Sequence, residues 1–200
     1  MVKRKVSLEG IDIFEIGLDL KRSVYKTVKA LPDSYSLLII VKTKRYEKLL
    51  SALLDLYVND EKRSGLFIST NKPVVKVIGT LDKEKKVGTE KIYFVDCMTE
   101  LSRLDGKIFY CPPQNLTDLN LAIEKMLKMH EDIGFVLLDS LSTLFIYNED
   151  KPVQKFITTL IRKTADRKMK GIFITTKTAN NAAALEDLAI FFDEVLTLNL

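Results

Sequence analysis

One apolar run, followed at once by an acid and small hydroxyl residues, constrains the fold more than any other stretch. Residues 134–144 read GFVLLDSLSTL. The consecutive apolar residues Phe135 to Leu138 cannot alternate between a wet and a dry face, so they predict a strand buried on both sides, as in a helix-covered parallel sheet. Asp139 then lies at the carboxyl end of the strand, where ligands bind in open α/β sheets. We therefore take Asp139 as the first candidate for a functional residue.

Similar short apolar runs recur along the chain and alternate with stretches of helical periodicity. The other predicted strands are residues 37–41, 65–70, 91–96, 107–111, 171–176 and 195–198. Apolar residues three or four apart predict helices within residues 46–57, 74–81, 119–127, 153–161 and 182–192, with a loop from residue 140 to 150. Alternating strands and helices imply right-handed crossovers, and hence an α/β fold with a mostly parallel sheet and helices on both faces.

The segment before Ser36 interrupts this pattern. Its apolar residues are spaced three or four apart from Ile13 to Leu31, which favours a helix over residues 11–31, and Pro32 ends it. A chain of 200 residues suffices for one domain with a full core. We therefore predict an N-terminal helical extension over residues 1–35, outside the core, and a core domain over residues 36–200.

Charge and cysteine content exclude several classes of protein. The chain has 31 basic and 27 acidic residues, a near balance that singles out neither nucleic acid nor an anionic membrane. Cys97 and Cys111 are too few for a disulfide scaffold or a four-ligand zinc site, and His130 lacks metal-ligand neighbours, so no metal site is predicted. No apolar segment reaches the roughly 18 residues of a membrane helix, which favours a cytoplasmic protein.

With this order of elements, residues 36–198 resemble the RecA-like core of the KaiC and RadA group of P-loop ATPases, and archaeal KaiC-like proteins above all. Residues 135–144 are similar to that family's Walker B strand and the residues after it, residues 171–176 to its Gly-Ile-Phe-Ile strand, and residues 192–198 to its final strand. The resemblance implies a three-layer RecA-like α/β fold. It also implies that Asp139 and Ser140 are the remnant of Walker B, whose aspartate holds magnesium.

The segment that should bind phosphate departs from the family. There, the loop after the first strand is glycine-rich and ends in Gly-Lys-Thr, whereas residues 41–49 read VKTKRYEKL. In an ungapped frame Glu47 takes the place of the phosphate-binding lysine, and a carboxylate there would repel a polyphosphate by several kcal/mol at ~4 Å. Asn71 and Lys72 stand where the family carries acidic residues that activate water, and neither is a good base at neutral pH.

These departures predict a catalytically inactive KaiC/RecA-like homologue, not an enzyme and without a cofactor, that acts as a protein-interaction or regulatory module. The partner would be another protein or a second copy of the chain. Two alternatives remain open. One is an ATP-binding protein that takes magnesium and ATP through an atypical phosphate loop, and the other is a recombinase-like accessory protein that binds nucleic acid.

Other candidate residues have two interpretations each. The cations Lys42, Lys44 and Arg45 form an anion site at a helix start or a solvated basic loop. A second basic cluster is a candidate nucleic-acid surface, or a set of cations that suit the end of a helix: Arg162, Lys163, Arg167 and Lys168.

Asp139 and the two cysteines also allow a structural interpretation. Asp139 either is a remnant magnesium ligand or caps the loop or helix that follows, through Ser140 and nearby N–H groups. Cys97 and Cys111 both end predicted strands, so they are either a regulatory disulfide or ordinary semi-buried thiols.

Overall fold

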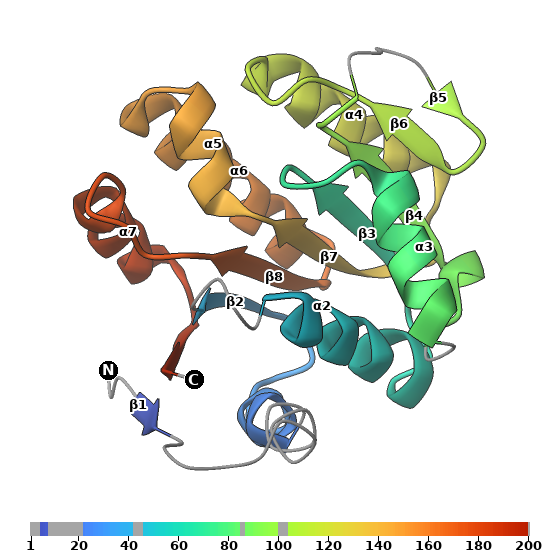
Figure 1. The fold of residues 1–200 in the computed structure, drawn as a ribbon, viewed down its shortest axis with the longest axis horizontal. Coiled ribbons are helices and arrows are strands. Elements are labelled where there is room, and N and C mark those ends of the chain that lie inside the picture. The colour runs from blue at the N-terminus through green and yellow to red at the C-terminus, as the bar shows by residue number, and fades with distance from the viewer. Residues whose placement is uncertain (1–4, 8–21, 42–45, 85–86, 100–103, 200) are drawn as a thin grey trace.

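A nine-stranded sheet forms the centre of the computed structural model, which describes residues 5–7, 22–41, 46–84, 87–99 and 104–199 (Figure 1). The strands are β1 (Lys5–Ser7), β2 (Tyr35–Val41), β3 (Ser64–Ser69), β4 (Ile92–Asp96), β5 (Leu104–Asp105), β6 (Ile108–Tyr110), β7 (Ile133–Asp139), β8 (Lys170–Thr175) and β9 (Glu194–Asn199). Their spatial order is β1-β9-β2-β8-β7-β3-β4-β6-β5. Every pair is parallel except β5 with β6, which confirms the predicted mostly parallel sheet.

Helices cover both faces of the sheet and complete three layers. They are α2 (Tyr46–Leu54) with the π-helix η2 (Asp55–Asp60), α3 (Val74–Glu84), the 3₁₀ turn η3 (Thr89–Lys91), α4 (Leu116–Met129), α5 (Leu141–Tyr147), α6 (Asp150–Asp166), and α7 (Ala182–Leu188) with the 3₁₀ turn η4 (Ala189–Phe191). Side chains of α2, η2 and α3 pack in one core cluster, and those of α4, α5, α6 and α7 in the other. The two clusters confirm the predicted α/β fold with helices on both faces.

The central strand β7 explains why its run is continuously apolar. Phe135 and Leu137 pack in the cluster with α2 and α3, whereas Val136 and Leu138 pack in the cluster on the other face. Successive side chains on a strand point to opposite faces, so both faces of β7 are buried. Asp139 continues the series of Phe135 and Leu137 and therefore faces α2 and α3, which is where the candidate site lies.

The described parts of the N-terminal segment pack onto the core rather than lie outside it. Residues 22–28 are helical, and Val24 and Val28 are buried in the cluster with α2 and α3. The short strand β1 pairs with β9, with Lys5 beside Thr197. The rest of the helix predicted over residues 11–31 lies outside the described residues.

A second difference concerns the segment after Asp139. A loop was expected up to residue 150, but α5 begins at Leu141 and ends at Tyr147, and the expectation was wrong. Leu141 and Leu144, three residues apart, are both fully buried, which holds this short helix against the core. None of the helices in the described part of the chain has the length and apolar character needed to cross a membrane.

Candidate functional site

Two aspartates end strands at the same edge of the sheet, separated by β3. Asp96 ends β4, and its carboxylate is fully used: Oδ2 accepts hydrogen bonds from the Val74 N–H at 3.0 Å and the Thr99 hydroxyl at 2.9 Å. Its Oδ1 accepts from the Met98 N–H at 2.8 Å. Asp96 thus caps the start of α3 and shapes the turn after β4, which is a structural role.

Asp139, at the end of β7, has the opposite environment. The residue is 1% exposed, and within the described part of the chain its Oδ1 has no hydrogen-bond partner. Burial raises the pKa of Asp139 to about 8, so the carboxyl group is mostly protonated at neutral pH. The interpretation of Asp139 as a cap is wrong for this oxygen, because the Ser140 N–H donates instead to Thr70 Oγ1 at 2.6 Å.

The backbone around Asp139 is nevertheless held firmly. Thr70, directly after β3, accepts the Ser140 N–H and donates its hydroxyl hydrogen to the Ser140 carbonyl oxygen at 2.8 Å. Its own N–H donates to the Asp139 carbonyl oxygen, and the Asp139–Ser140 peptide bond is cis. The Ser140 hydroxyl bonds the hydroxyl of Ser142 at 2.6 Å. Thr70 therefore holds the main chain at Asp139 and Ser140, while Oδ1 of Asp139 has no hydrogen-bond partner among the described residues.

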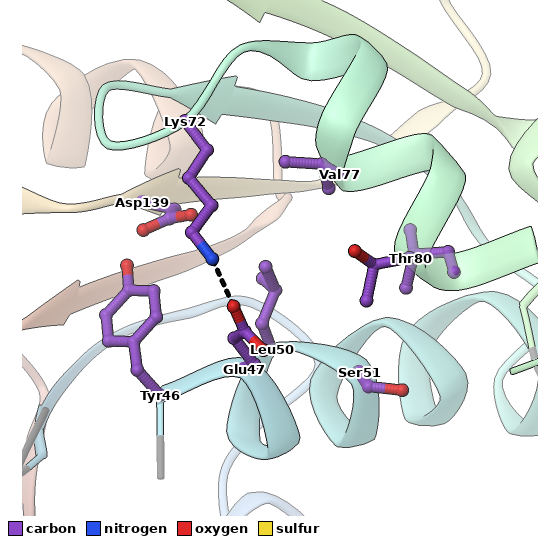
Figure 2. A pocket seen from close by; sticks show the side chains of 9 residues that line it. Tyr46, Glu47, Leu50, Ser51, Lys72, Val77, Thr80 and Asp139 are labelled. Atoms are coloured by element: carbon purple, nitrogen blue, oxygen red, sulfur yellow. Dashed lines mark hydrogen bonds and ion pairs between the residues drawn. The ribbon is translucent and has the colours of Figure 1, made fainter. Parts of the chain in front are cut away.

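A small cavity lies in front of Asp139, between α2, α3 and the end of β7 (Figure 2). The centre of a water molecule can occupy about 30 Å³ of it. The side chains that line it are Tyr46, Glu47, Leu50, Ser51, Lys72, Val77, Thr80, Leu81 and Asp139. The Tyr46 hydroxyl oxygen is buried and also has no hydrogen-bond partner among the described residues. Two unpaired oxygen atoms therefore belong to residues that line one cavity.

An ion pair lies at this cavity. Lys72 donates to Glu47, as the dashed line in Figure 2 marks, and joins the loop before α3 to the first turn of α2. Both side chains are largely exposed, Lys72 by 43% and Glu47 by 64%. The sequence singled out both residues as departures from the ATPase pattern, but it did not predict that they pair, because 25 residues separate them.

Magnesium triphosphate, the ligand implied by the RecA-like resemblance, does not fit these residues. In the ungapped frame of the resemblance Glu47 stands where a cation would meet phosphate, and among the described residues that line this cavity its charged partner is Lys72. Protonated Asp139 is a poor magnesium ligand. Among the described residues no group of three or more His, Cys, Asp or Glu side chains is placed to hold a metal ion. The candidate anion-binding residues Lys42, Lys44 and Arg45 lie outside the described residues.

The candidate nucleic-acid cluster lies at the end of α6 and is partly used within the protein. Lys163 and Arg167 contact the Glu124 carboxylate at 2.8 and 3.1 Å, and these contacts lower the pKa of Glu124, the Lys163 hydrogen bond most of all. Arg162 and Lys168 are exposed. Two of the four cations therefore join α6 to α4, and two face solvent.

The two cysteines lie at the ends of neighbouring strands. Cys97 and Cys111 follow Asp96 and Tyr110, which are in register in β4 and β6, and both thiols are free and buried. Burial raises the pKa of both, that of Cys111 to about 11. Thiols with such pKa values hold little thiolate at neutral pH, so their environment favours ordinary buried thiols over a reactive pair.

Comparisons with known proteins agree with the fold. A family model described as "Family of unknown function (DUF7504)" matches residues 40–198. No curated protein matches the chain. Among solved structures, the chain is similar to the KaiC-like protein PH0186 from the hyperthermophilic archaeon Pyrococcus horikoshii OT3, with a TM-score of 0.57 and 12% identity over 84% of this chain and 72% of that one. At this identity the likeness concerns the fold, and it confirms the predicted RecA-like, KaiC-like architecture.

Proposed function

The chain belongs to the DUF7504 family, a family of unknown function whose model matches residues 40–198, and we propose that it is a RecA-like domain that does not hydrolyse ATP. Its role is that of a protein-interaction or regulatory module. The observation that carries this proposal is the Glu47–Lys72 ion pair. In the ungapped frame of the resemblance, Glu47 stands at the position of the phosphate-binding lysine, and among the described residues its carboxylate is paired with Lys72.

The state of Asp139 also supports the proposal. Magnesium in nucleotide sites is held by one or two ionised carboxylates together with phosphate oxygens. A carboxyl group with a pKa of about 8 is mostly uncharged at neutral pH, and no basic side chain among the described residues forms an ion pair with it. Phosphoryl transfer depends on electrostatic stabilisation by such groups, so this pocket has little to offer the reaction.

The interaction role is supported by large apolar side chains that face solvent. Ile146 and Tyr147 end α5, and Ile190 and Phe191 lie in η4. Ile146 and Ile190 are each about three quarters exposed. Exposed apolar groups of this size are typical of surfaces that bind other proteins, and a second copy of the chain is the simplest partner to test.

Calorimetry with magnesium and ATP tests the first half of the proposal. We expect no heat of binding at micromolar protein and no phosphate release above the buffer rate, while an active RecA-like ATPase in the same buffer serves as the positive control. Micromolar binding that Asp139→Ala abolishes would refute the proposal and establish an atypical nucleotide site.

Sedimentation equilibrium tests the second half. We expect association of the purified chain that weakens when Ile146→Asp places a charge on α5, whereas Lys168→Asp, a charge change on the exposed end of α6, leaves it unchanged. A monomer at all accessible concentrations would exclude the second copy as the partner.

A further inference from the structure

Two buried oxygen atoms belong to residues that line one cavity, and neither has a hydrogen-bond partner in the described part of the chain. They are Oδ1 of Asp139 and Oη of Tyr46, in residues that are 1% and 8% exposed. Buried polar atoms in native proteins are paired with few exceptions, and each exception requires an explanation. Asp139 ends a strand buried in the sheet and is 1% exposed, so bulk solvent does not reach its side chain. A molecule bound in the cavity could supply the hydrogen-bond donors that these two oxygen atoms lack.

The surroundings of Asp139 favour a positively charged donor. Asp139 is mostly protonated at neutral pH in the absence of a charged partner, and a cation beside it would favour the ionised form, which only accepts hydrogen bonds. A phenol oxygen has lone pairs to accept them as well. Among the described residues, the charged groups that line the cavity or end a strand at this edge near it are Glu47, Lys72 and Asp96. Glu47 and Lys72 neutralise each other, and Asp96 is occupied by its own donors. Among the described residues no cation pairs with Asp139, so a cationic ligand would meet an uncompensated acid.

The size of the cavity and the residues that line it further restrict the choice of ligand. A water molecule needs at least about 10–15 Å³ of space for its centre, and the cavity offers about 30 Å³. An ammonium group is close to water in size and carries several N–H donors. The walls are largely apolar, formed by Leu50, Val77, Leu81 and the ring of Tyr46. They suit a short alkyl chain, and an aromatic ring also attracts a cation.

We propose that this cavity binds a small primary amine, whose ammonium group donates to Asp139 and Tyr46 while its alkyl chain lies against Leu50 and Val77. The inference rests on the proposed absence of a triphosphate from this place. It goes beyond that function, because it assigns the cavity a ligand of its own. A polyphosphate and an amine carry opposite charges, so the two ligands are distinguished by direct binding.

The test uses three probes of similar shape and different charge, namely n-propylamine, 1-propanol and propionate. Each is titrated into the full ¹⁵N-labelled chain, and backbone amide shifts of residues 46–51 and 72–81 are followed. A ligand of four non-hydrogen atoms reaches a Kd of about 40 µM at best, so the titration extends into the millimolar range. We expect n-propylamine to bind at least about tenfold tighter than 1-propanol, since its hydrogen bonds are charge-assisted. Propionate should cause no shift.

Three variants localise the binding. Asp139→Asn keeps the shape of the side chain without its charge and should lower the affinity for n-propylamine by about tenfold or more. Tyr46→Phe removes the second acceptor and should weaken it by about threefold. Asp166→Asn removes one carboxylate from the exposed end of α6 and should change nothing, which controls for the loss of net charge.

The outcomes that overturn the inference are distinct from those that overturn the proposed function. Equal binding of 1-propanol and n-propylamine, unchanged affinity in Asp139→Asn, or no shift with the amine would each overturn the amine site and indicate an ordered water only. Should Asp139→Asn fail to fold, Tyr46→Phe and the three probes still decide. Micromolar binding of magnesium ATP would instead refute the proposed function.

Discussion

Each end of the parallel sheet buries an ionisable side chain, but among the described residues only the one at the amino end has a charged partner. At the amino end, Lys170 begins β8 and donates to Glu61 at 2.6 Å, while its Nζ lies 5.4 Å and 5.7 Å from the ring centres of Tyr35 and Tyr57. The two phenol hydroxyls share a hydrogen bond of 2.6 Å. At the carboxyl end, Oδ1 of Asp139 has no hydrogen-bond partner in the part of the chain that the structure describes. The first arrangement serves the fold, and the second leaves room for an external group.

The largest expected effect concerns the pH dependence of stability at the carboxyl end. The pKa of Asp139 is about 8 in the folded protein and near 3.9 when unfolded. Between these values the folded state binds the extra proton, so the free energy of unfolding falls as pH rises and levels off above pH 8. In urea titrations at pH 5, 7 and 9, the free energy of unfolding of the wild type should fall between pH 5 and pH 9 by about 4 kcal/mol more than that of Asp139→Asn. Parallel pH profiles for the two proteins would contradict the burial of an unpaired acid.

The next effect concerns the ion pair at the amino end. Glu61→Gln leaves the buried Lys170 ammonium without its carboxylate, which should lower the free energy of unfolding by about 3 kcal/mol at pH 7. Adding Lys170→Met removes the stranded charge and should recover part of the loss. Urea denaturation of both proteins measures the difference, and a double variant that is less stable than Glu61→Gln would argue against a buried pair.

A smaller effect is expected at the paired phenols. Burial raises the pKa of Tyr35 and Tyr57, so both hydroxyls stay protonated at physiological pH. Tyr35→Phe leaves the fully buried Tyr57 hydroxyl without this partner and should cost about 1–2 kcal/mol. Thermal unfolding followed by circular dichroism measures the change, and a neutral result would show that the hydroxyl pair adds nothing to stability.

A tyrosine-to-phenylalanine substitution at the carboxyl end of the sheet should have the smallest effect on stability. Tyr46→Phe removes a hydroxyl that has no hydrogen-bond partner among the described residues, so the free energy of unfolding should change by less than about 0.5 kcal/mol or rise slightly. Measured beside Tyr35→Phe under identical conditions, it separates a completed polar cluster from an incomplete one. A loss as large as that of Tyr35→Phe would mean that the two ends are alike.

The sequence predicted the fold where burial leaves a local pattern. The apolar run over residues 37–41 became β2, and the run over 171–176 became β8 with an offset of one residue, because strands buried on both faces need consecutive apolar side chains. The strand β1 is only three residues long and α5 contains just two buried leucines, so neither has enough periodicity to stand out.

Only part of the candidate site could be predicted from the sequence. That part consists of residues whose role follows from their position relative to a strand or helix. Asp139 follows a strand, and that position alone sets it at the rim of the sheet. Lys170 was part of a basic run in the sequence, yet it is buried, because Glu61 reaches it across 109 residues. The Tyr46 hydroxyl and the pairing of Lys72 also depend on contacts between distant segments. Such contacts leave no periodic pattern.

The strength of the Glu47–Lys72 ion pair at the cavity should depend on ionic strength. Exposed ion pairs contribute at most about 1 kcal/mol, and dissolved salt screens them further. Added salt should therefore weaken this contact between α2 and the loop before α3, while the hydrogen bonds of Thr70 to the main chain at Ser140 stay in place. The side chains around the cavity would then respond to ionic strength, whereas the sheet beneath them would not.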